Sequence, residues 1–487
     1  MMDEKKYVTY EQFGAKGDGK TDDLPAIVAA HNYANENGLD VRANDDATYY
    51  IGGKALTAKI MTNTYFGKAK FIIDDVKLEN IRQNLFNVAT SAQRFTPDIK
   101  SLVHDQKKVD FPHEGNVYVR VYSNQRKVYI RKGLNMNNGS DASDAFIVDK
   151  DGNVLNGINW DYENISSAVA FSVDDEPIVI DGGIFTTIAN QWVSKYDYHS
   201  RNFNITRSNV TVQNLTHYVE GELDHGAPYS GFLSVGECNN VTLKDCLLTP
   251  HKTYQTESKI PGQMVSMGTY DLGFGGSIGV KLINITQTID IMNSAYWGLM
   301  GSNFCKDMHL EGCTISRFDA HCGVTDGSIK NCNLGYMGLN LIGFGNFTVE
   351  DSSIFGGNFI SFRSDYGSFF HGNLTIKNCE WIPRYGRGNK MYFFGANNTG
   401  DHYFGYDCGM PENIVLENVT IKDENISAEN LTYYLFPDYD GTFAPGKPYP
   451  YGTPKNVSAK LTSNAGREVK ICEKAAEYPY LDELVIG

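Results

Sequence analysis

Long hydrophobic runs and an excess of positive charge are both missing from this sequence. No stretch of its 487 residues approaches the roughly 18 consecutive apolar residues of a membrane-spanning helix. Its 43 Lys and Arg are outnumbered by 58 Asp and Glu, and the net charge of −15 disfavours non-specific binding to nucleic acid or to anionic membranes. The opening MMDEKKYVTYEQFG has no apolar core of a signal peptide, so we expect a cytoplasmic chain or the mature form of a secreted or periplasmic protein.

Cysteine and proline are also sparse. The nine cysteines are an odd number and form no CxxC pair or zinc-ligand spacing, so we expect reduced, buried thiols. Proline occurs 15 times, whereas glycine occurs 48 times and, with asparagine, separates short apolar segments. Aromatic residues make up 12% of the chain, enough for a large core. These features favour an all-β protein and disfavour a helical bundle or a disordered chain.

A repeated segment dominates residues 210–421. Each copy has alternating β-branched or leucine residues, a polar pair, and then a small or apolar residue. The copies are VTVQNLTH, VTLKDCLL, VKLINITQ, MHLEGCTI, GSIKNCNL, FTVEDSSI, LTIKNCEW and IVLENVTI. Their sixth residues are Leu215, Cys246, Ile285, Cys313, Cys332, Ser352, Cys379 and Val419, at spacings of 31, 39, 28, 19, 20, 27 and 40. Repeats of about 20 to 30 residues with short strands are typical of a stacked solenoid.

Alternation, not helical periodicity, runs through these repeats, which predicts a parallel β-helix over residues 178–424. A single coil cannot bury its inner face, so neighbouring coils stack. The aligned cysteines should then form an inward ladder of small apolar side chains. Asparagines at the turns should form a second ladder, because Asn tolerates the left-handed backbone conformation. The longer spacings fit either one coil with a loop or two coils.

The rest of the chain divides into three parts. Residues 1–87 should hold the first coils and a capping helix over 22–37, begun by Thr21 or Asp22, ended by Gly38, and turning Ala26, Ile27, Ala30 and Tyr33 inward. Residues 88–177 alternate strictly and predict an antiparallel β insertion, with SNQR and KDGN as hairpin turns. Residues 425–487, rich in Pro, Gly and Tyr over 435–455, predict an extended tail that packs along the solenoid.

The N-terminal run FGAKGDGKTDD (13–23), followed by a helix and then ATYYI (47–51), resembles the start of pectate-lyase-superfamily proteins. That superfamily includes polygalacturonase-like hydrolases, polysaccharide lyases and phage tailspikes. The resemblance implies a right-handed parallel β-helix solenoid with an N-terminal capping helix, and it indicates a fold, not a chemistry. The adjacent Asp pair and the Gly-His-Gly motif of the hydrolases are missing from the repeats. Calcium-dependent pectate lyases carry Asp or Glu clusters with a nearby Lys or Arg, but the Lys residues here stand mostly on turns such as LKD and IKN, so that site is not carried over.

Polar residues recur along the repeats at coil-sized steps and predict a groove for a linear polymer. They are His225, His251, Asp271, Asn303, Asp319, Asn340 and Arg363. Asp319 and His321 are two apart, so in a strand they face the same side and would form a tuned acid/base pair. Arg363 could hold a sugar carboxylate in bidentate fashion, with Asp365 and Tyr366 beside it. For each of these residues a structural role, as a turn cap, an ion pair or a ladder residue, is the alternative.

The candidate site has two groups of residues and three functional readings. Catalytic candidates are His321, Asp319, Arg363, Asp365, Tyr366 and Asp271; substrate-binding candidates are His225, His251, Tyr270, Asn303, Asn340 and Trp297. The favoured reading is β-elimination in a uronate-containing polysaccharide, with His321 as base, Arg363 and Asn340 neutralising the carboxylate, and Tyr366 or Tyr270 as acid.

Hydrolysis by a pair of carboxylates drawn from Asp271, Asp319 and Asp365 is the first alternative. The second is a non-catalytic, tailspike-like carbohydrate-binding protein. We expect a polysaccharide or oligosaccharide as partner, no nucleic acid and no membrane, and either a monomer or a homo-oligomer. No metal-ligand cluster and no cofactor are expected, with Ca²⁺ as the one open alternative.

Overall fold

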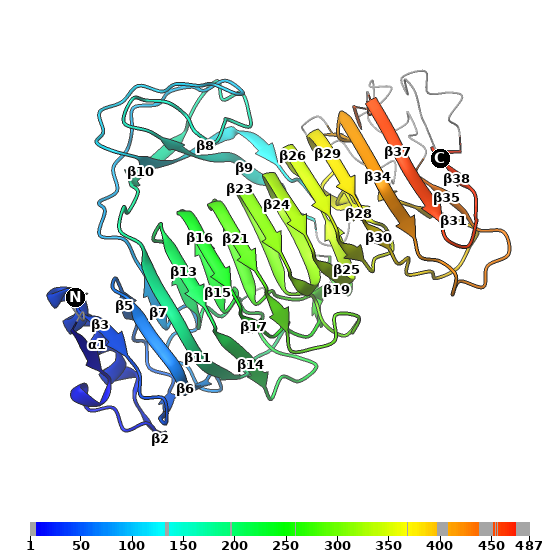
Figure 1. The fold of residues 1–487 in the computed structure, drawn as a ribbon. Coiled ribbons are helices and arrows are strands. Elements are labelled where there is room, and N and C mark those ends of the chain that lie inside the picture. Colours follow the sequence, from blue (N-terminus) through cyan, green and yellow to red (C-terminus); the bar gives the residue numbers. More distant parts are fainter. Residues whose placement is uncertain are drawn as a thin grey trace, which may run out of the picture.

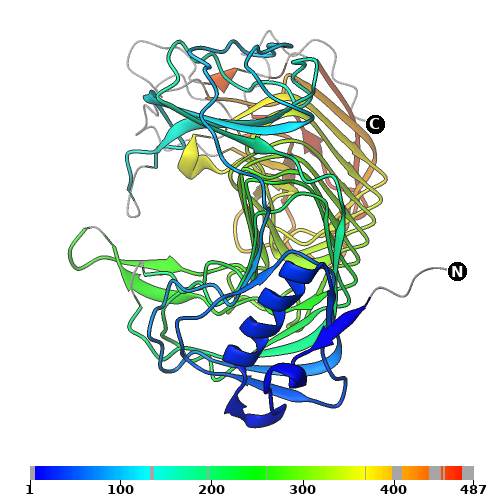
Figure 2. The ribbon, with the colours of Figure 1, turned by 90° about the vertical axis from the view of Figure 1, so that its left-hand side faces the viewer.

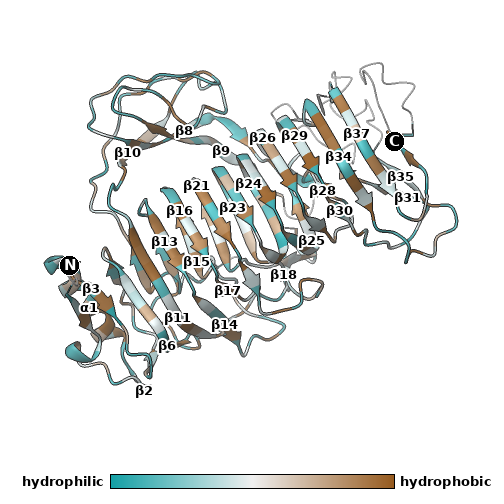
Figure 3. Cartoon of the chain, in the orientation of Figure 1, coloured by the Kyte–Doolittle hydropathy of each residue, from teal (hydrophilic) through white to brown (hydrophobic). Residues whose placement is uncertain are grey.

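The computed structural model describes residues 6–131, 136–194, 197–258, 260–367, 369–396, 408–437, 451–452, 454 and 456–473. Three series of parallel strand pairings wind the chain into a parallel β-helix, which confirms the predicted fold class (Figure 1). Hydrophobic and hydrophilic residues alternate along its strands, and the hydrophobic ones face the interior (Figure 3). No helix among the described residues is long and apolar enough to cross a membrane.

The first face contains β1 (Tyr7–Thr9), β3 (Asp40–Arg42), β6 (Thr64–Asp74), β11 (Ile178–Ile188), β13 (Val210–Gln213), β16 (Asn239–Lys244), β21 (Ile278–Ile283), β23 (Met300–Glu311), β24 (Thr314–Lys330), β26 (Gly343–Glu350), β29 (Phe370–Lys377), β34 (Asn413–Ile421) and β37 (Asn456–Ser463). The second adds β2 (Asp18–Asp22), β4 (Thr48–Ile51), β14 (Thr216–Glu220), β17 (Leu247–Leu248), β22 (Thr286–Gln287), β27 (Ser353–Ile354) and β30 (Glu380–Trp381). The third adds β5 (Ala58–Ile60), β7 (Phe86–Val88), β12 (Phe203–Ile205), β15 (Leu233–Gly236), β20 (Leu272–Gly275), β25 (Asn333–Asn340), β28 (Ile360–Ser361) and β32 (Phe394–Gly395). The long strands β6, β11, β23, β25 and β34 turn a corner and serve two faces, and β24 turns two corners and serves all three.

The predicted coil register is confirmed at every spacing. Val210 pairs with Val241, Val241 with Val280, and Val280 with Met308, and the same register continues to Ile414. Each spacing is therefore one coil, and the longer ones carry a loop. The eight aligned side chains are all buried, and the four ladder cysteines among them are free thiols.

The asparagine ladder is also present, on the outside of the turns. Asn413 donates to Asn373 at 2.6 Å, and Asn373 donates to Asn346 at 2.7 Å. In a second row Asn418 donates to Asn378 at 3.0 Å, and both residues have the left-handed conformation, with φ of 53° and 51°. Each amide thus links one coil to the next.

The capping helix α1 runs over Leu24–Asn37 and ends at Gly38, whose φ is 63°. Two details differ from prediction. Residue Asp23 is the N-cap, and its carboxylate accepts the backbone N–H groups of Lys16 and Gly17, at 2.6 and 3.0 Å, not those of the helix. Tyr33 is 46% exposed, because the buried stripe of the helix runs through Leu24, Ile27, Ala30, His31 and Ala34 and leaves Tyr33 to one side.

The insertion is an antiparallel sheet of β10 (Ser167–Ser172), β8 (Val117–Val128) and β9 (Ser140–Val148). The predicted SNQR turn is wrong, because those residues lie within β8, where its register with β9 shifts in a bulge between Ser123 and Lys127. The KDGN turn is confirmed by the Gly152 N–H bond to the Asp149 carbonyl oxygen, at 2.9 Å. The apolar side of the sheet packs on the solenoid, where Trp160 contacts Phe344 and Phe369.

A hairpin of β18 (Tyr254–Glu257) and β19 (Met264–Met267) leaves the solenoid on the side that also carries the insertion, and the two face each other (Figure 2). The predicted tail differs from the structure in one respect: β37 pairs with β34 in parallel, so the solenoid continues past residue 424. Residues 438–450, within the predicted Pro-, Gly- and Tyr-rich tail, lie outside the described residues. Further strands are β31 (Lys390–Tyr392), β35 (Thr432–Tyr434), β38 (Val469–Lys470), β33 (Cys408–Gly409) and β36 (Tyr451–Gly452), and two 3₁₀ turns are η1 (Glu11–Phe13) and η2 (Ser364–Tyr366).

Candidate functional site

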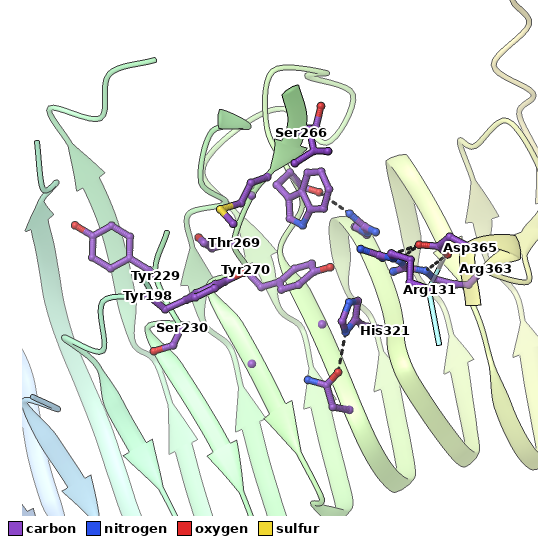
Figure 4. Close-up of a pocket in the computed structure, with 18 residues that line it drawn as sticks. Arg131, Tyr198, Tyr229, Ser230, Ser266, Thr269, Tyr270, His321, Arg363 and Asp365 are labelled. Carbon is purple, nitrogen blue, oxygen red and sulfur yellow. Dashed lines mark hydrogen bonds and ion pairs between the residues drawn. The ribbon is translucent and has the colours of Figure 1, made fainter. Parts of the chain in front are cut away.

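A cleft of about 590 Å³ lies on the third face, between the insertion and the loops that lead into β12, β15, β20 and β23 (Figure 4). Its lining begins at Tyr198, before β12, and ends at Asp365, after β28. Neighbouring strands lie about 4.8 Å apart, so the six steps from β12 to β28 span roughly 29 Å. A cleft of this length, crossing the strands, has the shape to hold a linear chain.

Six of the predicted residues line this cleft: Tyr270, Trp297, Asn303, His321, Arg363 and Asp365. Figure 4 shows Tyr270, His321, Arg131 and Arg363 at one end, while Tyr198 and Tyr229 lie toward the other. The coil-sized steps found Asn303 and Arg363 directly, and Tyr270, His321 and Asp365 each stand within two residues of a position in that column.

Arginine and aspartate side chains form a network at the first end, here called the arginine–aspartate cluster: Arg131, Arg317, Arg363, Asp319 and Asp365. Asp319 is completely buried beneath the cleft, with Arg363 Nη1 at 2.7 Å from both oxygens and Arg317 Nη2 at 2.6 Å from Oδ2. The Tyr270 hydroxyl donates to the same carboxylate. Burial alone would raise the pKa of Asp319, but the two guanidinium groups outweigh it and hold that pKa well below its usual range.

Asp365 is the one carboxylate among the residues that line the cleft, and its side chain is 38% exposed. Arg363 holds it through Nε at 3.1 Å and Nη2 at 2.9 Å, and Arg131 Nη2 lies 2.6 Å from Oδ2. Burial opposes its charge, but Arg363 and Arg131 prevail and lower the pKa of Asp365 to about 2. Asp365 is therefore ionised at neutral pH. Three arginines then face two carboxylates, a local charge of about +1 in a chain with a net charge of −15.

His321 lies between Asn303 and Tyr366. Its Nδ1 is 2.9 Å from Asn303 Oδ1, and its Nε2 is 2.8 Å from the Tyr366 hydroxyl. Burial, reinforced by Arg363, lowers the pKa of His321 to about 4. The imidazole is thus neutral at neutral pH, and these partners fix its proton on Nδ1 and its lone pair on Nε2.

The predicted acid/base pair of Asp319 and His321 is not formed as a hydrogen bond. Asp319 faces the arginines, while His321 faces Asn303 and Tyr366. The reason is a bulge in β24: Gly301 of β23 pairs with Asp319, but Asn303 pairs with Cys322, so β24 has one extra residue at this point. A bulge breaks the alternation on which the same-side argument depends.

Two of the predicted residues instead belong to a second network behind the cleft, here called the histidine–carboxylate chain: His217, Asp271, His251 and Glu222. Asp271 is fully buried, 2.9 Å from His217 Nδ1 and 3.6 Å from His251 Nε2, and His251 Nδ1 is 3.0 Å from Glu222. Burial opposes a charge on His251, but Glu222 and Asp271 outweigh it and raise its pKa to about 10. Asp271 and His251 are thus paired with buried partners and are not among the residues that line the cleft, although the sequence placed them in the groove.

The other predicted residues also lie off the cleft. His225 is half exposed, pairs with the neighbouring Asp224 at 3.2 Å and is not among the residues that line the cleft. Asn340 uses its amide on the Met337 carbonyl oxygen, at 2.9 Å. Tyr366 is 3% exposed and is not among the residues that line the cleft.

Twelve of the 18 lining residues were not predicted, among them Arg131, Arg317, Tyr198 and Tyr229. Arg317 stands two residues before Asp319, and its place in the same strand was a usable signal. Arg131 comes from the insertion and meets Asp365 across 234 residues of sequence, so no repeat could reveal it. No group of three or more His, Cys, Asp or Glu side chains in the described ranges is arranged to hold a metal ion.

Comparison with known proteins yields only distant structural resemblance. No protein-family model matches the chain, and no curated protein matches it. The surface adhesin PfbA of Streptococcus pneumoniae aligns with a TM-score of 0.43 and 11% identity, over 96% of this chain and 92% of its own. The tailspike protein gp49 from Pseudomonas phage LKA1 gives 0.40 and 12%, over 96% and 81%. The A-module of the Azotobacter vinelandii mannuronan C-5 epimerase AlgE4 gives 0.35 and 10%, over 99% and 100%.

Proposed function

We propose that this protein binds a linear polysaccharide containing sugar acids along the third-face cleft and cleaves it by β-elimination. The observation that carries the proposal is the composition of one end of the cleft: a neutral histidine, a phenol and surplus guanidinium groups surround a single exposed carboxylate. Elimination needs a base, an acid and a cationic partner for the charge that develops on the sugar carboxylate.

The residues suit these roles as follows. His321 Nε2 would take the proton on the carbon next to the sugar carboxylate. The carbon–oxygen bond to the leaving sugar then breaks, a carbon–carbon double bond forms, and the leaving oxygen takes a proton from Tyr270, whose hydroxyl lies in the cleft and donates to Asp319. Tyr270 suits the acid role better than Tyr366, because Tyr270 lines the cleft, whereas Tyr366 is only 3% exposed and is not among the lining residues.

The pKa of His321 sets a condition on this mechanism. A base with a pKa of about 4 is weak, but an anionic sugar bound beside it favours the protonated form and raises that pKa. Substrate must also displace the Tyr366 hydroxyl from Nε2, where it lies 2.8 Å away. Both effects couple proton abstraction to the binding of an acidic substrate.

Hydrolysis by two carboxylates has less support. It requires one carboxyl group that stays protonated as the general acid. Asp319 is completely buried and Asp271 lies in the histidine–carboxylate chain, while Asp365 is held ionised by two arginines. All three have lowered pKa values.

The test is to incubate the protein with uronate polysaccharides and follow the ultraviolet absorbance of an unsaturated uronate, with reducing ends measured alongside and with a chelator in a parallel arm. We expect absorbance and reducing ends to rise together. His321→Ala should lower the rate roughly 10²- to 10⁴-fold, the usual worth of a general base. His309→Ala is the matched control, because His309 also bonds two side chains but lies off the cleft.

New reducing ends without absorbance would show hydrolysis and overturn the proposal. Binding without either product would indicate a carbohydrate-binding protein. Loss of activity with chelator would add a Ca²⁺ requirement to the mechanism.

A further inference from the structure

We propose that Arg131, delivered by the insertion, is the residue that binds the substrate's carboxylate, and that the insertion thereby sets the preference for acidic over neutral sugars. The inference rests on the proposed function only in that the cleft must hold a polysaccharide. It moves the role predicted for Arg363 to a different arginine, from a different part of the chain.

Arg363 has no nitrogen left for a ligand. Its Nη1 contacts both oxygens of Asp319, and its Nε and Nη2 hold the two oxygens of Asp365. A bidentate grip on a sugar carboxylate would require breaking one of these pairs, and removing one partner of a buried ion pair is strongly unfavourable. Arg363 therefore positions the two aspartates.

Arg317 is occupied in a similar way. Its Nη2 pairs with Asp319 at 2.6 Å, and its Nη1 donates to the Trp297 carbonyl oxygen at 3.3 Å. Its guanidinium carbon lies 4.9 Å from the centre of the Trp297 ring, and its side chain is only 5% exposed. It forms the floor of the cleft and offers little to a ligand.

Arg131 differs from both. Its Nη2 pairs with Asp365 at 2.6 Å, while its Nη1 makes no hydrogen bond to any described residue. Its side chain is 15% exposed, more than that of Arg363 or Arg317, and it lines the cleft. Of the three arginines in the positively charged arginine–aspartate cluster, Arg131 is therefore the one whose Nη1 can donate to a ligand.

The fold holds Arg131 in place before any ligand arrives. Its guanidinium carbon lies 4.5 Å from the centre of the Tyr366 ring, and the Asp365 carboxylate fixes one edge. Two residues earlier, Tyr129 is buried in the core shared by the insertion and the solenoid, 5.3 Å from the Phe304 ring. A cation that is already ordered loses little entropy on binding, which favours affinity.

The ligand class follows from the chemistry of the group. The guanidinium of Arg131 keeps Nη1 unpaired, while Nη2 is held by Asp365 and Nε is buried, so Nη1 can donate to a carboxylate oxygen. The local charge of about +1 is what one uronate carboxylate would neutralise. A methyl ester of the same sugar keeps the shape and removes the charge. Comparing acid and ester therefore isolates the contribution of Arg131.

The experiment measures affinity by calorimetry for a uronate oligosaccharide and for its methyl ester, with the wild-type chain and with Arg131→Gln. We expect Arg131→Gln to weaken binding of the acid roughly 10- to 100-fold, the worth of a charge-assisted hydrogen bond, and to leave the ester almost unchanged. Wild-type affinity for the acid should also fall with added salt, and the variant's much less.

The matched control is Arg94→Gln. Arg94 also belongs to the insertion, pairs with Glu237 at 2.7 Å and lies 4.8 Å from the Phe171 ring, but it is off the cleft. It should bind like wild type, and thermal unfolding of both variants confirms that they are folded.

An acid-to-ester preference that survives in Arg131→Gln would overturn the inference. Binding of the acid that depends on Arg131 without any cleavage would keep it and overturn the elimination mechanism instead. If Arg131→Gln cleaves the acidic substrate with the wild-type KM, the elimination mechanism stands and the role of Arg131 in binding the carboxylate is overturned.

Discussion

Two charged networks lie along the same solenoid, yet they differ in how far a ligand can reach them. The arginine–aspartate cluster reaches the cleft, with Asp365 at 38% and Arg131 at 15% side-chain exposure. The histidine–carboxylate chain has no member above 7%, and the strands of the β18–β19 hairpin begin just beyond it. Both sets hold charges in pairs, but only the first presents them to a ligand.

The contrast shows that residue type and coil spacing are not enough to define a binding site, because the side chains must also be exposed to a ligand. Glu222 accepts from His251, from the backbone N–H of Lys252 and from the Tyr254 hydroxyl, at 3.0, 3.0 and 2.6 Å. The chain therefore fastens the base of the hairpin, and β19 in turn supplies Val265 and Met267 to the cleft wall. We infer that one network contacts the substrate and the other positions the wall.

The largest difference between the two networks should be seen in the unfolding free energy when one carboxylate charge is removed from each. Asp271→Asn leaves His251 and His217 buried without their shared carboxylate, and such losses cost roughly 3–5 kcal/mol of unfolding free energy. Asp365→Asn should cost far less, because its carboxylate is partly solvated. Urea unfolding of the two variants measures the difference, and equal losses would contradict the division of roles.

The second prediction uses pH. The pKa of His251 is raised to about 10 in the folded protein, above its usual value, so its stabilisation is fully present below about 6.5 and is lost as pH rises through about 10. The groups that face it are Glu222, Asp271 and the Tyr229 ring, 4.9 Å away.

We therefore expect the unfolding free energy of the wild type to fall between pH 7 and pH 10 more steeply than that of Glu222→Gln, in which the main source of the raised pKa is gone. Denaturant titrations of both proteins at several pH values test this. Parallel curves would mean that His251 is not charged in the folded state.

The smallest effect is expected outside both networks. His225→Ala removes a half-exposed ring whose one partner is Asp224, on the surface. Melting temperature and cleavage rate should both stay at wild-type values. A changed rate would show that the substrate extends to the 221–226 loop and would widen the site beyond the cleft.

Much of this fold could be read from the sequence, because a solenoid repeats the same burial every coil. Cys313 and Cys332 occupy one interior position in consecutive coils, so their spacing of 19 residues appeared directly in the chain. The SNQR segment was misread because a bulge within β8 has the same polar composition as a turn. The last coil was missed because only the structure shows β37 paired with β34.

The site was less predictable, for two physical reasons. Asp271 recurs at the same coil steps as Arg363, and only three-dimensional packing shows that one is closed off and the other reaches the cleft. Arg131 lies in a segment without the repeat, and its contact with Asp365 depends on how the insertion docks. Periodicity can propose a column of residues, but it cannot say which loops cover that column or what approaches from the other side.

The constant register of coils between 19 and 40 residues long bears on how such a chain can evolve. An added or deleted residue in a loop changes only the length of that loop, because the next strand still meets the same partner. A shift of one residue within a strand would instead turn every following side chain to the opposite face. Insertions and deletions are thus tolerated in the loops, which form the cleft wall, but not in the strands, which form the core. The β18–β19 hairpin, and with it one wall of the cleft, can therefore change in length without any change to the solenoid.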